Sequence, residues 1–241
     1  MSLLKSNDKV EAKEIVSRLG KLRTRIAEAE RRYDRRAGSV SLLVVSKFQS
    51  TQTIRAVYQA GQRDFGESYV QEALGKQAEL RDCAITWHFI GALQSNKTRH
   101  VAQHFDWVHS IDRFKTAARL NEQRPEELPP LNICLQVNLG AERQKAGMDA
   151  AQLAALAAQL QPLTRLRIRG LMVLPPATAD FNEQRGYFRR VREAFELLRA
   201  QGHSLDTLSM GMSDDLEAAI AEGATLARIG TALFGERPQN P

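Results

Sequence analysis

Lys47 is the residue whose type and place in the chain most clearly suggest chemistry, because it directly follows the apolar run 41–46 (SLLVVS). A continuous Leu/Val run without alternation is typical of a strand buried on both faces of a parallel sheet. An amine at the mouth of such a sheet is partly desolvated, which disfavours its charged form and makes it a nucleophile toward carbonyl carbons. The sequence therefore suggests a Schiff-base lysine, with a strand-end lysine that extends its ammonium group to water as the alternative.

Two turns near the end of the chain combine glycine with hydroxyl residues: 209–214 (SMGMSD) and 228–231 (RIGT). Each leads into a helical pattern, whose free N–H groups and dipole favour an anion. Pyridoxal 5'-phosphate (PLP) needs an amine for its aldehyde, donors for its phosphate and a partner for its ring nitrogen, and Lys47, the turns and Arg228 would supply them. An arginine beside that nitrogen opposes its protonation, which makes the ring a weaker electron sink. Taken singly, each turn is also consistent with ordinary turn and capping chemistry.

The apolar pattern shows which elements would position these residues. Eight segments are predicted to be strands: 42–46, 64–67, 85–90, 107–110, 132–138, 168–173, 207–210 and 225–229. Helical patterns follow them: 51–60, 69–81, 96–104, 112–124, 150–160, a helix with the apolar stripe 187–198, then 214–222 and 231–234. One more helix, over 8–36, precedes the first strand.

Regular alternation of strand and helix implies a parallel sheet, and eight such units close most naturally into a barrel. The predicted fold is an α/β protein, a single (β/α)8 TIM-type barrel with an extra N-terminal helix, in one PLP-binding domain over 1–241 with a polar tail at 236–241. A doubly wound open sheet is the alternative, but the glycine-rich turn of dinucleotide folds is missing after the first strand. In a closed barrel strand 1 lies beside strand 8, so Lys47 and Arg228 would point into one mouth.

The composition is that of an ordinary globular protein, with 43% hydrophobic and 26% charged residues in 241. No apolar run approaches the ~20 residues that span a bilayer, and the N-terminus lacks the apolar core of a signal peptide, so we expect a cytoplasmic protein without a membrane partner. Cys83 and Cys134 are isolated, which indicates neither a zinc site nor a disulfide framework. His100 and His104 have the spacing of a helical metal pair but no carboxylate motif beside them, so we expect no metal.

The net charge of +6 raises the possibility of an anionic partner, either nucleic acid or a phosphorylated small molecule. The densest basic cluster lies at the end of the first predicted helix and comprises Arg31, Arg32, Arg35 and Arg36. Cations there complement the helix dipole, and no nucleic-acid recognition motif accompanies them. We therefore expect a solvated helix end and no nucleic-acid partner, with a basic nucleic-acid-binding barrel kept as a third class of function.

Several sequence blocks closely resemble the pyridoxal phosphate homeostasis protein family: 44–47 (VVSK), 65–67 (FGE), 87–97 (WHFIGALQSNK), 209–215 (SMGMSDD), 227–231 (ARIGT) and 233–235 (LFG). The similarity runs in register from about Lys21 to Gly235, and the WHFIG block is highly specific to the family. The family looks like the barrel domain of alanine racemase standing alone, and it holds PLP on a lysine.

The resemblance implies a role for individual residues. Lys47 matches the Schiff-base lysine of the family, and Arg228 matches the arginine near the pyridine nitrogen. The residues that match the phosphate loops are Ser209, Gly211, Gly230 and Thr231. His88, inside the WHFIG block, either approaches the cofactor ring or is packed and hydrogen-bonded.

The chain departs from the family pattern at two places near the expected site. Residues 48–50 (FQS) stand where the family usually has Thr-Lys-Pro, which removes a basic residue near the mouth. Ser68 stands where the family usually has asparagine, which shortens a side chain expected near the cofactor. The charged segment 142–147 is either a lid over the mouth or an ordinary surface loop.

The resemblance implies a carrier that holds PLP, contributes to intracellular PLP homeostasis and supplies PLP-dependent apoenzymes, with no catalytic residue of its own. The alternative is an amino-acid racemase of the alanine racemase type, which needs a base on each face of the substrate and takes one, a tyrosine, from a second domain of a partner subunit. This chain ends at Pro241 without such a domain, and its tyrosines all fall in predicted helices: Tyr33, Tyr58, Tyr69 and Tyr187. We expect a non-catalytic monomer.

Overall fold

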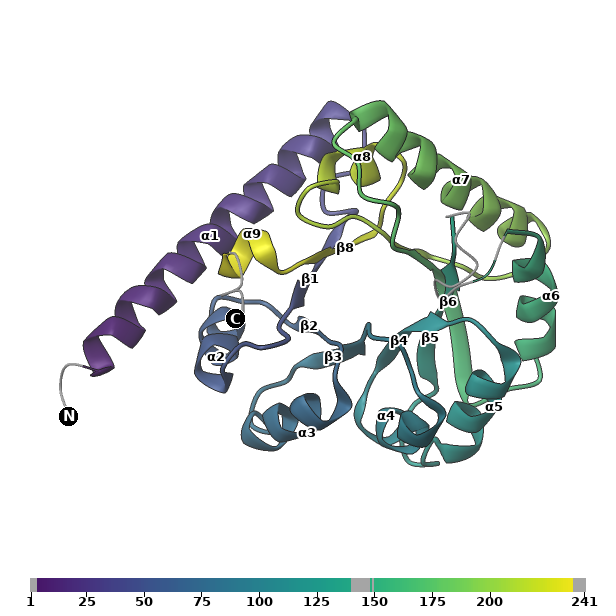
Figure 1. Ribbon diagram of the computed structural model, residues 1–241, viewed down its shortest axis with the longest axis horizontal. Helices are drawn as coiled ribbons and strands as arrows, with labels where there is room; N and C mark the ends of the chain where they lie inside the picture. Colours follow the sequence, from purple (N-terminus) through teal and green to yellow (C-terminus); the bar gives the residue numbers. More distant parts are fainter. Residues whose placement is uncertain (1–3, 140–147, 149, 236–241) are drawn as a thin grey trace.

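Eight parallel strands form a closed barrel in which each strand is hydrogen-bonded to the next and β8 pairs with β1. Figure 1 shows the strands arranged in a ring. The computed structural model describes residues 4–139, 148 and 150–235. The strands are β1 (Ser41–Val45), β2 (Asp64–Glu67), β3 (Thr86–Phe89), β4 (Trp107–Ile111), β5 (Leu131–Val137), β6 (Leu166–Val173), β7 (Thr207–Ser209) and β8 (Leu226–Ile229). The predicted (β/α)8 barrel with an N-terminal helix is therefore confirmed.

Helices surround the barrel on its outer side (Figure 1). They are α1 (Leu4–Arg32), α2 (Thr51–Gln59), α3 (Val70–Glu79), the 3-10 turn η1 (Ser95–Lys97), α4 (Thr98–His104), α5 (Phe114–Gln123), α6 (Ala150–Leu160), α7 (Phe181–Ala200), α8 (Leu216–Ala221) and α9 (Thr231–Phe234). Predicted and observed boundaries differ by a few residues at several ends. Two of the tyrosines expected in helices lie just outside them, since Tyr33 follows α1 and Tyr69 precedes α3.

The main apolar core lies between the strands and the surrounding helices. On β3, Trp87 and Phe89 belong to this core, whereas His88 between them points into the barrel and bonds to side chains of β2 and β4. Phe89 meets Phe105 edge to face at a centroid distance of 5.5 Å, and burying each such ring stabilises the fold by about 1.5–3 kcal/mol. On β3 the period of two thus separates apolar side chains on the outer face from a polar one in the interior.

The long helix α1 covers the seam where the first and last strands meet. It packs against α2, α8 and α9, and its buried residues recur at helical spacing: Ile15, Leu19, Leu22 and Ile26. The seam itself pairs Leu43 with Arg228 and Val44 with Ile229. By packing on the helices on both sides of this seam, α1 stabilises the pairing of β1 with β8.

Helix α1 ends four residues before the predicted position. Asp34 adopts a left-handed backbone with φ 52°, and the N–H of Arg35 donates to the carbonyl of Glu30 over 2.8 Å, which ends the helix in a tight turn. Beyond this turn, the Arg35 guanidinium donates to the backbone carbonyls of Ile220 and Ala224. Part of the basic cluster is therefore used to attach α1 to α8 rather than left to a nucleic acid.

Candidate functional site

A cavity of about 250 Å³ opens at the carboxyl ends of the strands, slightly smaller than the usual size range of ligand pockets. Its walls combine apolar side chains with a few polar groups, and they come from both ends of the chain. The lining residues are Val45, Lys47, Gln49, Ser68, Ile90, Met172, Leu174, Met212, Ser213, Asp214, Arg228, Gly230, Thr231, Phe234 and Gly235. Four of the six residues predicted to bind a cofactor are among them.

Lys47 is half-buried and lies two residues beyond the end of β1. The residue before it is fixed, because the Ser46 hydroxyl donates to Glu67 Oε1 over 2.6 Å and the Ser46 carbonyl accepts from Lys76 Nζ over 2.7 Å. Lys76 and Glu67 are both buried and form an ion pair of 2.8 Å. This buried pair therefore fixes the backbone just before Lys47 and so orients Lys47 toward the cavity.

The residue after Lys47 is fixed as well. Phe48 has a left-handed backbone with φ 66°, uncommon for a residue with a side chain, and its N–H donates to Glu72 Oε1. The Phe48 ring packs on Tyr69 at a centroid distance of 5.4 Å, and both rings are exposed. The chain therefore turns sharply immediately after the lysine and places the Phe48 ring at the surface, against the Tyr69 ring that precedes α3.

Arg228 is buried on β8 and is held by backbone and hydroxyl oxygens. Its Nη1 donates to the carbonyl and to the hydroxyl of Ser209, the latter over 2.8 Å, and its Nη2 donates to the carbonyl of Val173 over 2.7 Å. Burial lowers the pKa of Arg228 to about 10, while the nearby Asp215 acts in the opposite direction. The guanidinium therefore stays positively charged at neutral pH, and three hydrogen bonds orient it.

Gly230 and Thr231 begin the short turn of α9 beside Lys47. A Cβ on Gly230 would come within 3.3 Å of the carbonyl oxygen of Val45, so the backbone approaches the end of β1 closely here. Ser213, from the loop after β7, also borders the cavity, and its hydroxyl accepts from the N–H of Ala232 over 3.1 Å. This bond joins the two loops predicted to hold phosphate.

The other two predicted ligands, Ser209 and Gly211, do not border this cavity. Ser209 is the last residue of β7, is fully buried, and points into the barrel, where its hydroxyl meets His109 and Arg228. Gly211 has φ 96°, and a Cβ there would lie 2.7 Å from that of Ala219, so its role is to let the loop turn against α8. From the same loop, Ser213 borders the cavity.

Ser213 was missed although it lies in the same glycine-rich turn. Counting two residues per period from the end of β7 would have placed Ser209 inside the barrel and moved the candidate ligands further along the loop. Ser68 borders the cavity, as its match to a family position near the cofactor suggested.

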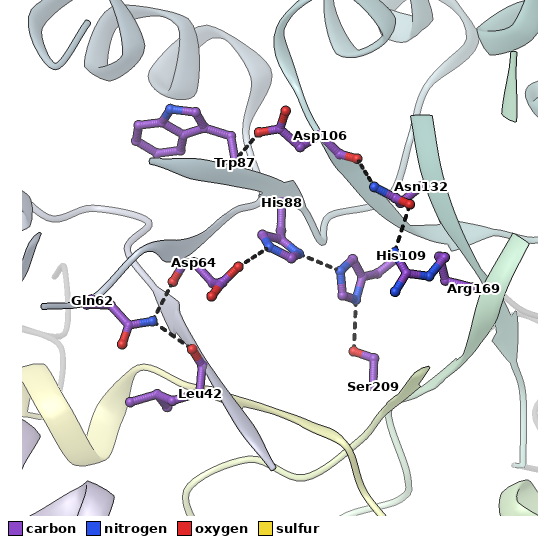
Figure 2. A network of polar contacts seen from close by, with 10 residues as sticks. All are labelled: Leu42, Gln62, Asp64, Trp87, His88, Asp106, His109, Asn132, Arg169 and Ser209. Carbon is purple, nitrogen blue, oxygen red and sulfur yellow. Dashed lines mark hydrogen bonds and ion pairs between the residues drawn. The ribbon is translucent and has the colours of Figure 1, made fainter. Parts of the chain in front are cut away.

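The structure decides between the two interpretations of His88. Its ring lies inside the barrel, 3.1 Å from Asp64 Oδ1 and 3.0 Å from His109 Nε2, and it does not border the cavity (Figure 2). It is therefore packed and hydrogen-bonded. The segment 142–147, considered as a lid, falls outside the described residues.

The described part of the chain offers neither a metal-binding cluster nor a membrane span. His104 Nδ1 lies 3.0 Å from the carbonyl of His100, an ordinary contact within a helix. No three His, Cys, Asp or Glu side chains in this part are grouped to hold a metal ion. Of the helices in 4–139 and 150–235, none is both long and apolar enough to cross a bilayer.

Comparison with solved structures first defines the class of barrel. The alanine racemase of Corynebacterium glutamicum superimposes with a TM-score of 0.67 at 15% identity, covering 92% of this chain and 60% of that one, so the two share a fold. PipY of Synechococcus elongatus, solved with PLP bound, superimposes with a TM-score of 0.80 at 44% identity, covering 92% of this chain and all of that one.

Sequence comparison narrows the class. The family model for the N-terminal domain of alanine racemase matches residues 18–238. The pyridoxal phosphate homeostasis protein of Pseudomonas aeruginosa is 56% identical over 223 residues, covering 92% of this chain and 96% of that protein. The protein of the same name from Escherichia coli K12 is 48% identical over 227 residues, covering 93% and 97%. The chain belongs to the pyridoxal phosphate homeostasis protein family.

Proposed function

We propose that this chain binds PLP in the cavity at the carboxyl ends of its strands and holds it on Lys47 as a Schiff base, as part of cofactor homeostasis. The observation that carries the proposal is that a half-buried lysine, a charged arginine and the Gly230-Thr231 turn border one cavity. The names of the relatives and the PLP bound to PipY support the same cofactor.

The donor set of the cavity fits this cofactor. Val45, Ile90 and Met172 give an apolar wall for a flat ring, and hydroxyl and backbone donors of Ser213 and Thr231 lie where a phosphate would be held. Bound PLP supplies an aldehyde carbon and an electron-withdrawing ring. Lys47 would hold the aldehyde carbon through its amine, with loss of water, and so keep a reactive carbonyl out of solution.

Arg228 has a role distinct from that of Lys47. A permanently charged donor facing the ring nitrogen leaves that nitrogen unprotonated and so weakens the ring as an electron sink. A site built in this way stores the cofactor better than it stabilises carbanions. The names of the relatives, rather than Arg228 itself, favour a carrier with no catalytic residue of its own over an amino-acid racemase.

The position of Tyr69 bears on the racemase alternative. Tyr69 lies at the surface, with its ring tilted against that of Phe48, and is not among the residues that border the cavity. A racemase needs a second base across the substrate from the lysine. We expect purified holoprotein to show no racemisation of alanine or serine, and turnover that vanished in Lys47→Ala would favour the enzyme.

The wider parts of the proposal are those expected from the sequence: a single-domain cytoplasmic monomer that passes PLP to apoenzymes. An exchange assay tests the last point. Holoprotein and a PLP-dependent apoenzyme would be separated by a membrane that passes PLP but not protein, or mixed directly. Faster reactivation on mixing would support transfer by contact, and equal rates would contradict it.

The decisive test of the cofactor and its anchor is spectroscopic. Wild-type protein is expected to show a visible Schiff-base band that borohydride abolishes, and mass spectrometry should then place the reduced adduct on Lys47. Lys47→Ala should lack the band, whereas the control Lys115→Ala, which changes an exposed lysine of α5, should keep it. Wild-type protein that stays colourless with added PLP would overturn the proposed function.

A further inference from the structure

The interior of the barrel carries a continuous chain of hydrogen-bonded side chains, most of which Figure 2 shows. At one end Asp64 Oδ1 lies 3.1 Å from His88 Nε2. His88 Nδ1 lies 3.0 Å from His109 Nε2, and His109 Nδ1 lies 2.8 Å from Ser209 Oγ. The chain ends where Ser209 Oγ accepts from Arg228 over 2.8 Å.

This chain connects the two ends of the barrel. Arg228 borders the proposed cofactor cavity at the carboxyl ends of the strands. Asp64 and His88 border a second cavity, of about 450 Å³, at the opposite end. Between these ends, His109 and Ser209 are fully buried, and His88 is 1% exposed.

Hydrogen-bond chemistry gives this chain a direction. An arginine can only donate and an ionised carboxylate can only accept, so His88 donates from Nε2 to Asp64. A neutral His88 then accepts at Nδ1 from the Nε2–H of His109. His109 in turn accepts at Nδ1 from the hydroxyl of Ser209, whose oxygen accepts from Arg228. Every hydrogen bond therefore points from Arg228 toward Asp64.

A proton added to His88 reverses the middle of the chain without moving a heavy atom. His88 would then donate from both nitrogens, so His109 Nε2 must become the acceptor. Burial, followed by the neighbouring His88 and Arg228, holds the pKa of His109 well below its usual value, so this ring stays neutral. Its single proton must therefore move to Nδ1, which donates to Ser209.

The remaining charged and titratable groups around the chain are few. At the open end, His88 is next to Asp64 on β2 and His109 on β4. Arg169 on β6 lies over the Trp107 ring, which stacks on His88, and Arg169 is paired with Asp206. Arg35 and Arg36 also line the second cavity. Near Arg228, Asp215 is a carboxyl whose pKa is raised by burial. Cys134 on β5 is neutral because burial raises its pKa to about 12. His88 is therefore the imidazole of the chain that borders an opening.

We propose that Ser209 and His109 are positioning residues for Arg228, and that they form with His88 a reversible hydrogen-bond chain coupling protonation at the far end of the barrel to the cofactor-facing guanidinium. The cofactor part of this inference rests on the proposed function. In the reversed state Ser209 Oγ accepts from His109 and Arg228 together, so its hydrogen must turn away. Added positive charge and this rearrangement then act on the group that faces the ring.

The first test needs no cofactor. Nitrogen-15 NMR of the imidazole rings distinguishes the two tautomers of His109 in the apoprotein. Above the His88 titration we expect His109 protonated on Nε2, and below it on Nδ1, with one midpoint for both residues. His100, His104 and His203 provide internal controls that should titrate independently. A His109 tautomer that stays the same from about pH 5 to about pH 9 would overturn the proposal.

A variant at the partly exposed end sharpens this test. Asp64→Asn removes the carboxylate that favours charged His88, so the His88 midpoint should fall. The His109 switch should fall with it, by the same amount. The backbone carbonyl of Asp64 that Gln62 contacts is unchanged, and circular dichroism checks the fold. A His109 transition that ignored the change at Asp64 would contradict the coupling.

The second test uses holoprotein and asks whether the cofactor senses the chain. PLP affinity in the wild type should fall about fivefold as His88 is protonated, a typical strength for coupling between sites. Ser209→Ala breaks the chain and should remove this component of the pH profile, whereas Ser209→Thr keeps a hydroxyl and should restore it. An unchanged profile in Ser209→Ala would refute the coupling. If no PLP binds at all, the proposed function fails, and the NMR result still decides on the chain.

Discussion

At the scale of single residues, the turn around Lys47 is fixed by a buried ion pair between two other residues, Lys76 and Glu67. The buried Lys76 ammonium contacts Glu67, Glu72 and the carbonyl of Ser46 within 2.6–2.8 Å. A buried ion pair is weak evidence for stability, because desolvating both charges offsets their attraction. The geometry suggests that this pair is kept for the position it gives to the turn around Lys47.

Glu67 should make the stability of the protein depend on pH. Burial raises its pKa, and Lys76 only partly opposes this shift. A carboxyl whose folded-state pKa is raised stabilises the fold at acidic pH, and that contribution is lost as pH rises through the folded-state pKa. We therefore expect wild type to lose stability relative to Glu67→Gln as pH rises through the folded-state pKa of Glu67. Urea unfolding at a series of pH values would measure this difference in the free energy of unfolding.

A matched variant separates this effect from general acid sensitivity. Glu126→Gln changes an exposed glutamate, and its difference from wild type should stay constant over the same pH range. Parallel pH profiles for wild type and Glu67→Gln would show that Glu67 ionises alike in the folded and unfolded chains, contrary to the expectation.

At the scale of elements, the end of α1 shows how much a single turn decides. Asp34 occupies the left-handed position after the helix, which glycine fills at no steric cost, and the turn directs Arg35 toward carbonyls in and just after the last turn of α8. The helical pattern in the sequence continued to Arg36, because a charged segment carries no sign that one residue has changed backbone region. Arg23, by contrast, reaches the carbonyl of Ala60 from within the helix.

Replacing Asp34 tests this account of the helix end. Asp34→Gly should raise the free energy of unfolding by up to about 1 kcal/mol, because glycine relieves left-handed strain. Asp34→Ala should lower it, because alanine adopts φ 52° less readily than aspartate. Thermal and urea unfolding of both variants would measure the order, and an alanine variant more stable than the glycine one would show that strain is not the deciding factor.

At the scale of the molecule, the closed barrel leaves no space for a side chain at the point where β6 and β7 approach most closely. A Cβ on Gly170 of β6 would lie 1.7 Å from the carbonyl oxygen of Thr207 on β7. Gly186, in the middle of α7, has nothing within 4 Å of the same position. Packing in the sheet therefore requires glycine at position 170, whereas the described packing around position 186 leaves room for a side chain.

Gly170→Ala and Gly186→Ala form a pair that tests closure. The first should cost more than about 3 kcal/mol or prevent folding, because backbone must move to admit the methyl group. The second should stabilise the protein by about 0.5–1 kcal/mol, because alanine favours a helix interior. Urea unfolding gives both values, and a mild effect of Gly170→Ala would mean that β6 and β7 can separate without loss of the barrel.

The regular alternation of apolar strands and amphipathic helices was enough to predict the barrel, because each unit carries its own local signal. It also placed Lys47 and Arg228 at one mouth, since that follows from closure alone. The cofactor contacts of these residues, and of Gly230 and Thr231, stay predictions.

The side-chain chain from Asp64 to Arg228 could not be predicted, because it depends on which residues of five strands stand level across the barrel. His88 and His109 are 21 positions apart in sequence and 3.0 Å apart in space. Ser209 and His109 are 100 positions apart and 2.8 Å apart. Such contacts depend on strand register and tilt, and the local sequence predicts neither.

The pairing of β1 with β8 has a consequence for synthesis on the ribosome. Lys47 follows the first strand and Arg228 belongs to the last, so the two halves of the proposed site emerge about 180 residues apart, a separation that takes on the order of 10 seconds to translate. Until β8 docks on β1, the nascent chain has an amine but no enclosing site. Completion of the barrel and the ability to hold a reactive aldehyde therefore arise together, at the last step of folding.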